Sequence, residues 1–535
     1  MYYIIGSGPA GISCAMALVK KGLNVTMLDY GLEIETERKA VVERMGRTDH
    51  QDWGKKDIDH LKENMEASSR GVSNKYIYGS DFPYRIDNDF MNMKIDNVDL
   101  LPSLAMGGFS NVWGAAILPY IQEDISDWPI GVEDFKPHYE SVLSFLNISA
   151  NKDELENQFP IYKSDYEFLK PSKQAGFLYE DLIKNKNKLH SAGFKFGYSR
   201  LAVRSGKQNG NYGCVYCGLC MYGCPYRLIY SSISTLSELQ KYNNFHYINN
   251  VYVYKIIEEK NFIRVLAVSS TSGQELIFVG ERVYLACGVI PTAKIILESM
   301  KEYDEEIKMK DSQYFIFPLL RYKGYGNPVK EDLHTLAQLY MEILDNLISN
   351  RTIHLQVYTY NDLYKRAVEK VLGRTYRFFE LPISKFLTRL MIVQGFLHSD
   401  YSSRISIKLK QVNGEIKNEL IISSIRNDSV KNTINKILKK LSVNKKYIRA
   451  IPLRFLLRIA QPGKGFHSGG TFPMSKNPLK YQSDLLGRPF GYKLLHIVDA
   501  SVFPSIPATT ITLSVMANSH RIATESVKNI IHYGG

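Results

Sequence analysis

The sequence predicts an α/β protein, in which a discontinuous Rossmann-like domain carries an inserted α+β domain built on a largely antiparallel sheet. Its first 31 residues show a strand, a glycine-rich turn, a helix and a second strand, which is typical of the start of a parallel sheet. Residues 311–455 differ, because strand-like runs alternate there with helical stretches. From residue 485 the first pattern returns. We therefore expect the first domain to span residues 1–310 and 456–535, and the inserted domain residues 311–455.

Short apolar runs predict the strands, and apolar residues at helical spacing predict the helices. In the first domain we expect helices at 12–21 and 512–531, and strands at 2–5, 23–28, 245–256, 262–269, 276–286 and 494–498. In the inserted domain we expect helices at 332–348 and 432–441, and strands at 314–322, 352–360, 404–410 and 420–424.

Composition narrows the class of protein. With 535 residues, 44% hydrophobic and 23% charged, the chain is neither collagen-like nor largely disordered, and its length suggests two or more domains. The net charge of +13 fits an anionic partner or a soluble basic surface, and no nucleic-acid module is recognisable. No apolar run is long enough for a membrane-spanning helix and no leader is recognisable, so we expect a location in the cytoplasm or at the cytoplasmic face of a membrane.

A glycine loop directly follows the first strand. Gly6, Gly8 and Gly11 form the pattern G-x-G-x-x-G, which allows a tight turn, close approach of a pyrophosphate and close packing of helix on strand. The N-terminus of the following helix offers free N–H groups to phosphates. Asp29 ends the second strand, where a carboxylate can accept hydrogen bonds from both hydroxyls of a ribose. The loop predicts a dinucleotide site, and by itself it does not choose between FAD and NAD.

A second group of motifs lies near the C-terminus. His467 begins the segment His-Ser-Gly-Gly-Thr-Phe-Pro-Met, and Asp499-Ala-Ser-Val follows before the last predicted helix. With the N-terminal glycines, this order resembles the glucose–methanol–choline (GMC) family of FAD-dependent alcohol oxidoreductases, which carries H-x-x-G-T, D-A-S-V and a helix in the same order. Other segments that resemble the family's flavin-contacting parts are the loop with Gly107, Gly108, Asn111 and Trp113, the strand and turn with Ala286 and Gly288, and Val251.

The resemblance implies an FAD-binding domain and a substrate domain that covers the isoalloxazine ring. It places Asp499 and Ala500 at the FAD diphosphate and ribityl chain and Val251 at the adenine. His467 would remove the substrate hydroxyl proton while a hydride passes to flavin N5, a task suited to a neutral imidazole. The sequence departs from the family at Thr510, where Asn or His is usual, so the second member of the catalytic pair would be a hydroxyl or would come from elsewhere in the chain. A second departure is Ser475, which replaces a glycine.

Four cysteines lie close together in the sequence. Cys214, Cys217, Cys220 and Cys224 have the spacing C-x2-C-x2-C-x3-C-P of bacterial iron–sulfur proteins, which favours a [4Fe–4S] or [3Fe–4S] cluster. Structural zinc, disulfides and a thiol loop without metal are the alternatives. A cluster would carry electrons from the flavin to an external protein or quinone. Cys14 and Cys287 lie in predicted flavin-domain elements and are expected to be small buried hydrophobic residues.

The combined motifs predict an FAD-dependent dehydrogenase that oxidises a CH–OH group of an alcohol, polyol or sugar, including glycans or lipid-linked sugars. The alternatives are a cluster-free flavin oxidase or isomerase and a non-catalytic flavoprotein, the last because Thr510 replaces the usual residue. Basic stretches at 439–449 and 454–458 mix charge with apolar residues, which fits either a solvated helix face or peripheral contact with a membrane.

Overall fold

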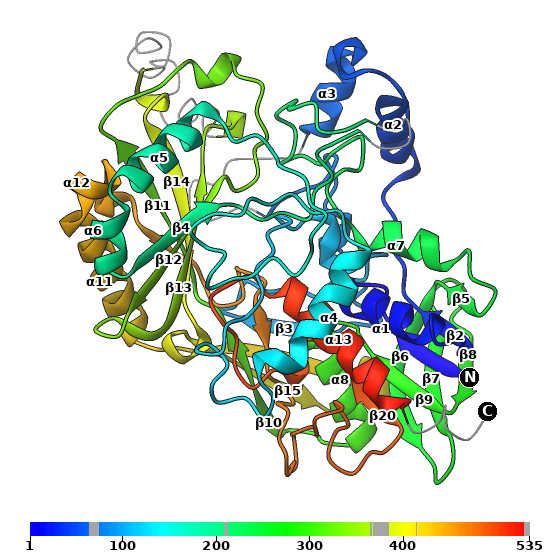
Figure 1. Cartoon of the computed structure of the whole chain (residues 1–535). Coiled ribbons are helices and arrows are strands. Elements are labelled where there is room, and N and C mark those ends of the chain that lie inside the picture. The colour runs from blue at the N-terminus through cyan, green and yellow to red at the C-terminus, as the bar shows by residue number, and fades with distance from the viewer. Residues whose placement is uncertain (64–73, 208–211, 364–365, 367–384, 413–414, 529–535) are drawn as a thin grey trace.

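A computed structural model describes residues 1–63, 74–207, 212–363, 366, 385–412 and 415–528 (Figure 1). At its centre is a five-stranded parallel sheet in the order β20-β9-β1-β2-β5. These strands come from both ends of the chain: β1 (Tyr2–Ile5), β2 (Val25–Leu28), β5 (Phe245–Ile248), β9 (Arg282–Leu285) and β20 (Leu495–Ile497). The parallel sheet and its discontinuous origin are as predicted.

Helix packing also joins the two ends of the chain. α1 (Pro9–Val19) begins directly after the glycine turn and packs against α13 (Thr512–Ser526), as the blue and red helices of Figure 1 show. Ten of the eleven residues of α1 are buried, because the helix lies between the sheet and α13. The helix predicted at 512–531 is confirmed to Ser526, and its last three positions lie outside the described residues. The other helices on this side of the molecule are α2 (Thr36–Arg47), α3 (Lys55–Leu61), α4 (Val132–Ser144), α7 (Ser232–Leu239) and α8 (Val289–Met300).

A seven-stranded antiparallel sheet forms the second layer, in the order β17-β11-β14-β13-β12-β4 with β18 also paired to β11. Helices cover its outer face (Figure 1), and their apolar side chains share one core with it. The strands are β4 (Phe194–Tyr198), β11 (Tyr314–Arg321), β12 (Leu339–Asp345), β13 (Ser349–Tyr358), β14 (Leu390–Phe396), β17 (Ala450–Pro452) and β18 (Arg458–Ile459). The covering helices are α5 (Lys173–Lys184), α6 (Lys186–Ser191), α11 (Ser429–Val443) and α12 (Lys445–Ile448).

The helix predicted at 332–348 is wrong, since this stretch contains β12. Leu339, Met341 and Ile343 pack into the core beneath the helices, while Tyr340 packs into the other core. Because both faces of the strand are buried, apolar residues occur at nearly every position, and helical and extended spacing then look alike. Pairing decides the outcome, with β13 on one side of β12 and the distant β4 on the other.

Two smaller sheets complete the fold. β6 (Val251–Glu258), β7 (Ile263–Ser269) and β8 (Glu275–Gly280) form an antiparallel meander. The other sheet has the order β19-β10-β15-β16-β3, made of β3 (Met93–Asp96), β10 (Glu306–Asp311), β15 (Arg404–Lys410), β16 (Glu419–Ile425) and β19 (Ser468–Gly469). β15 and β16 were expected in the inserted domain, but β15 pairs with β10 and β16 pairs with β3, and both of these strands precede residue 312. The domain limits at 310 and 455 therefore stay predictions. None of the described helices is long and apolar enough to span a bilayer.

Candidate active site

The glycine turn between β1 and α1 has little room on one side and open space on the other. A Cβ at Gly6 would lie 2.7 Å from the carbonyl oxygen of Ala286, and a Cβ at Gly11 would lie 1.9 Å from the carbonyl oxygen of Gly6. A Cβ at Gly8 would meet no protein atom within 4 Å. Gly6 and Gly11 are thus required by internal packing, whereas Gly8 faces a space that a ligand can approach.

Asp29 lies at the end of β2 beside this turn. Its Oδ2 accepts hydrogen bonds from the hydroxyl groups of Ser7 and of Tyr247, the latter at 3.0 Å. Burial raises the pKa of Asp29 to about 6, although both hydrogen bonds oppose that shift. The carboxylate is therefore held in place from two sides, at the position where a ribose is expected.

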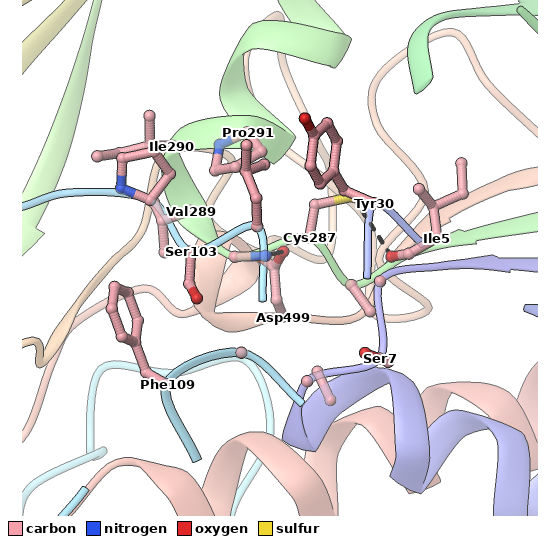
Figure 2. A pocket seen from close by; sticks show the side chains of 18 of the residues that line it. Ile5, Ser7, Tyr30, Ser103, Phe109, Cys287, Val289, Ile290, Pro291 and Asp499 are labelled. Carbon is pink, nitrogen blue, oxygen red and sulfur yellow. Dashed lines mark hydrogen bonds between the residues drawn. The ribbon is translucent and has the colours of Figure 1, made fainter. Parts of the chain in front are cut away.

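An open cavity begins at the turn and runs along the ends of the parallel strands (Figure 2). Its empty volume, including the part open to solvent, is about 1360 Å³. Of the predicted cofactor-binding residues, nine line this cavity: Gly6, Gly8, Asp29, Gly108, Val251, Ala286, Gly288, Asp499 and Ala500. A cavity at the carboxyl ends of parallel strands, above an unfilled glycine and a helix N-terminus, fits an elongated dinucleotide such as FAD.

The other predicted cofactor-binding residues do not line this cavity, and two of them hold its loops in place through hydrogen bonds. Gly107 adopts φ +80° and donates its N–H to the Ser7 hydroxyl at 2.8 Å, which joins the two glycine loops. The Asn111 amide donates to the carbonyls of Met106 and Gly108 at 2.9 and 2.7 Å, and so braces the second loop. Trp113 faces a second cavity instead, and its indole N–H donates to the Tyr230 carbonyl at 2.7 Å.

Asp499 joins two segments of the cavity wall. Its Oδ2 accepts hydrogen bonds from the N–H of Gly288 at 3.0 Å and from the Thr292 hydroxyl at 2.6 Å, while its Oδ1 accepts one from the N–H of Ser501 at 2.9 Å. Burial raises its pKa, and these donors oppose the shift. The aspartate therefore holds the turn before α8 against the D-A-S-V segment, which explains the need for an acid here.

The second cavity lies between two loops, at residues 109–116 and 464–467, and the antiparallel sheet. Its empty volume, again including open solvent, is about 1100 Å³. It shares five lining residues with the first cavity, so the two adjoin there: Pro9, Phe109, Phe466, Ile511 and Thr512. The two predicted catalytic residues, His467 and Thr510, both line it. Segments far apart in the sequence thus meet at a cavity next to the predicted dinucleotide site.

The environment of His467 keeps its imidazole neutral. Burial, with a smaller contribution from nearby His354, lowers the pKa of His467 to about 3. The ring stacks on Phe396 with centroids 4.9 Å apart, and its Nδ1 is buried without a hydrogen-bond partner in the described part of the chain. The backbone is fixed as well, because the His467 carbonyl accepts from the Ser312 N–H at 2.9 Å. A neutral imidazole that is fixed in the wall of a cavity can accept a proton from a bound molecule.

Thr510 is more constrained than the resemblance suggests. Its side-chain oxygen accepts a hydrogen bond from the Leu118 N–H at 2.8 Å, and the residue is only 3% exposed. It can still donate its hydroxyl hydrogen, but one side of the oxygen is occupied by the backbone. Thr510 therefore positions a loop and can offer at most a donor to a bound molecule.

The sequence did not point to several residues of the second cavity. Gln356 and Tyr358 on β13 and Gln394 on β14 line it, together with Lys75. Alternation along the predicted strand 352–360 puts residues 356 and 358 on one face, but nothing in the sequence says which face meets the cavity. The Lys75 ammonium donates to the Trp113 carbonyl at 3.2 Å, and burial lowers its pKa to about 8. No motif marks this lysine.

The four clustered cysteines are near one another but do not form a ready ligand set. Burial raises the pKa of Cys214 to about 12 and of Cys224 to about 11, and the neighbouring Cys220 thiol adds to both shifts. Cys217 is exposed, and all six cysteines of the chain are free thiols. Across the described residues, no three His, Cys, Asp or Glu side chains are arranged to hold a metal ion. Binding iron would require deprotonation and closer approach of these thiols.

Comparison with solved structures supports the same fold. The chain resembles pyridoxine 4-oxidase from Mesorbium loti, with 12% identity, a TM-score of 0.58, and coverage of 100% of this chain and 99% of that one. It also resembles formate oxidase from Aspergillus oryzae RIB40, studied as an R554A variant for its FAD modification, with 13% identity, a TM-score of 0.60, and coverage of 99% and 98%. At these identities the likeness concerns the fold.

Sequence comparison adds a family match for the C-terminal segment. No curated protein sequence matches the chain significantly. Residues 445–519, which include His467, Asp499 and Thr510, match the family described as GMC oxidoreductase. The matched segment is the one that brings the C-terminal motifs to the two cavities. It identifies residues 445–519 as the C-terminal part of a GMC oxidoreductase, and together with the fold and the dinucleotide cavity it indicates an FAD-dependent oxidoreductase that acts on the CH–OH group of its donors.

Proposed function

We propose that this oxidoreductase is a dehydrogenase for an alcohol, polyol or sugar, with His467 as the base. The observation that carries the proposal is the position of a half-buried, neutral imidazole in the wall of the cavity that adjoins the dinucleotide cavity. An alcohol gives up a hydride readily only when its hydroxyl proton is leaving as well, so a base at this junction is what the chemistry needs.

The reaction removes a proton from oxygen and a hydride from carbon, and leaves a carbonyl. Bound FAD would supply the hydride acceptor at its N5. Gly6, Gly8 and the N-terminus of α1 would bind its diphosphate, and Asp29 its ribose. His467 would take the hydroxyl proton on a ring nitrogen, and Phe396 would hold the ring in place through their stacking. Because the imidazole has a low pKa, it is a weak base, and we expect proton and hydride to leave together.

The low pKa of His467 predicts how the reaction depends on pH. The base form is lost only as the pH falls through the pKa of about 3, so the rate of flavin reduction should stay level from pH 8 to pH 5. An ordinary histidine with a pKa near 6.5 would lose about 30-fold over that range. Stopped-flow reduction, with flavin content checked at each pH, measures this. An acid limb with a pKa between 6 and 7 would contradict the lowered pKa of His467.

The experiment that tests the proposed function is anaerobic bleaching of the flavin by a panel of alcohols, polyols and sugars. Reduction by members of the panel is expected, with formation of the matching aldehyde or ketone. If no member of the panel bleaches the flavin, a non-catalytic flavoprotein is the better description of the chain.

The cysteine spacing supports a finer proposal, that residues 214–224 bind an iron–sulfur cluster through which electrons leave to a protein or a quinone. The support is the spacing itself and the proximity of the thiols to one another. The thiols are not arranged as a metal site within the described residues, and this favours a cluster-free oxidase as the second candidate function. Iron analysis and oxygen consumption of anaerobically purified protein separate the two.

Cys217→Ser provides the sharper test of the cluster. If a cluster is present, the substitution should remove iron and slow transfer to external acceptors, while reduction of the flavin by substrate is spared. The matched control is Cys14→Ser, because Cys14 is a buried free cysteine of α1 and lies outside the segment 214–224. Absence of iron from the wild-type protein would end the proposal.

A contact with the membrane surface is also a proposal, as is the cytoplasmic location. The membrane contact is supported by the segment around Phe455, a residue that is 81% exposed and lies between Arg454 and Arg458. An exposed aromatic ring among arginines suits an anionic lipid surface. Cosedimentation with vesicles that contain anionic lipid, lost at high salt and absent with zwitterionic vesicles, would support it.

A further inference from the structure

A chain of buried hydrogen bonds runs from the antiparallel sheet into the wall of the second cavity. Glu342 on β12 lies directly opposite His354 on β13, and its Oε1 is 2.6 Å from His354 Nδ1. His354 Nε2 is 3.0 Å from the Gln356 amide nitrogen, and the Tyr358 hydroxyl donates to Gln356 Oε1 at 2.9 Å. The four residues are between 0% and 6% exposed. Of them, Gln356 and Tyr358 line the cavity.

The hydrogen bonds of this chain point in one direction. An amide nitrogen can only donate, so His354 Nε2 must accept from Gln356 and the ring proton must lie on Nδ1, where it is donated to Glu342. The Tyr358 hydrogen is committed to Gln356, which leaves the tyrosine oxygen as an acceptor. Gln356 keeps one N–H free, so the cavity wall offers an acceptor next to a donor.

A neighbouring side chain completes this wall. Gln394 on β14 lies directly opposite Gln356 and also lines the cavity. Its amide makes no hydrogen bond to any residue that the structure describes. A half-buried amide with no partner among the described residues, beside an oriented donor and acceptor, can form hydrogen bonds with a polar ligand in the cavity.

We propose that the Glu342–His354–Gln356–Tyr358 chain recognises a second hydroxyl group of the substrate, so that the enzyme selects polyols or sugars over simple alcohols. This rests on the proposed function, because the first hydroxyl is the one that His467 deprotonates. A hydroxyl both donates and accepts, and so matches the acceptor of Tyr358 and the donor of Gln356 together. Glu342 and His354 act as positioning residues, since they reach the substrate only through Gln356.

The test compares the binding of two probes, cis-1,2-cyclohexanediol and cyclohexanol, to dithionite-reduced holoenzyme by ligand-observed NMR. The wild-type protein should bind the diol about tenfold more tightly, as expected for one added hydrogen bond of ordinary strength. Tyr358→Phe should bring the two affinities close together. The matched control is Tyr340→Phe, whose hydroxyl donates to the Arg200 carbonyl and does not line the cavity, so the preference should survive. Equal or undetectable binding of both probes by the wild type, or a preference that persists in Tyr358→Phe, overturns the proposal.

Glu342→Gln tests the direction of the hydrogen bonds that link Glu342, His354, Gln356 and Tyr358. An amide at position 342 can donate to His354 Nδ1, which allows the whole chain to reverse and Tyr358 to donate into the cavity. The wild-type protein should prefer the diol to 2-methoxycyclohexanol, whose ether oxygen only accepts, and this preference should narrow in the variant. An unchanged preference contradicts the positioning role. Binding to the reduced protein needs no turnover, so these results can be scored even if the panel fails to bleach the flavin.

Discussion

His467→Ala is expected to keep its FAD and to lose about 10³-fold in the rate of flavin reduction, within the range usual for removal of a general base. The imidazole lines the second cavity and not the dinucleotide cavity, so flavin binding should survive. Loss of the base leaves the hydroxyl proton without an acceptor while the hydride departs. Anaerobic stopped-flow reduction at saturating substrate, normalised to bound flavin, measures the effect.

A control variant separates this chemistry from the cost of removing a histidine ring. His334 is buried, its pKa is likewise lowered to about 3, and it lines neither cavity. His334→Ala should therefore reduce stability without a comparable loss of rate per bound flavin. If His467→Ala reduces its flavin as fast as the wild type does, the base lies elsewhere.

Gly8→Val is expected to leave the apoprotein folded and to weaken FAD binding by about 100-fold or more, because the second glycine is where the diphosphate approaches the backbone. The backbone at Gly8 has φ −66° and ψ 180°, which any residue adopts, and a Cβ there meets no protein atom within 4 Å. Only a bound ligand would clash with the new side chain. Titration of the apoprotein with FAD, followed by flavin fluorescence, measures the affinity.

The stability of Gly8→Val is as informative as its affinity. The melting temperature of the apoprotein should change by only a few degrees. Gly176→Val, in α5 and also with no atom within 4 Å of its Cβ, should keep wild-type FAD binding. Gly11→Ala should instead disturb the fold itself, because its Cβ would overlap the Gly6 carbonyl. Unchanged FAD affinity in Gly8→Val would place the diphosphate elsewhere.

Much of the flavin side of the molecule could be predicted because its signals are local. The glycine turn, β1, β2 and Asp29 occupy one short stretch, and each glycine has a steric reason that the sequence pattern already contains. The strand at 494–498 and the helix after Asp499 were predicted for the same reason. The error at 332–348 has the opposite cause: β12 owes its conformation to β4, more than a hundred residues away.

The sequence by itself determined the dinucleotide turn and the C-terminal family motifs, and it predicted the two residues expected at the reaction centre, since short motifs encode backbone turns and side-chain chemistry. Only the tertiary structure decided what surrounds His467. Three features arise where distant segments of the polypeptide meet. They are the low pKa of that imidazole, the hydrogen bond from a backbone N–H to the Thr510 hydroxyl, and the hydrogen bonds that run in one direction between Glu342 and Tyr358. Burial and hydrogen-bond partners are properties of that meeting, and no stretch of the chain carries them alone.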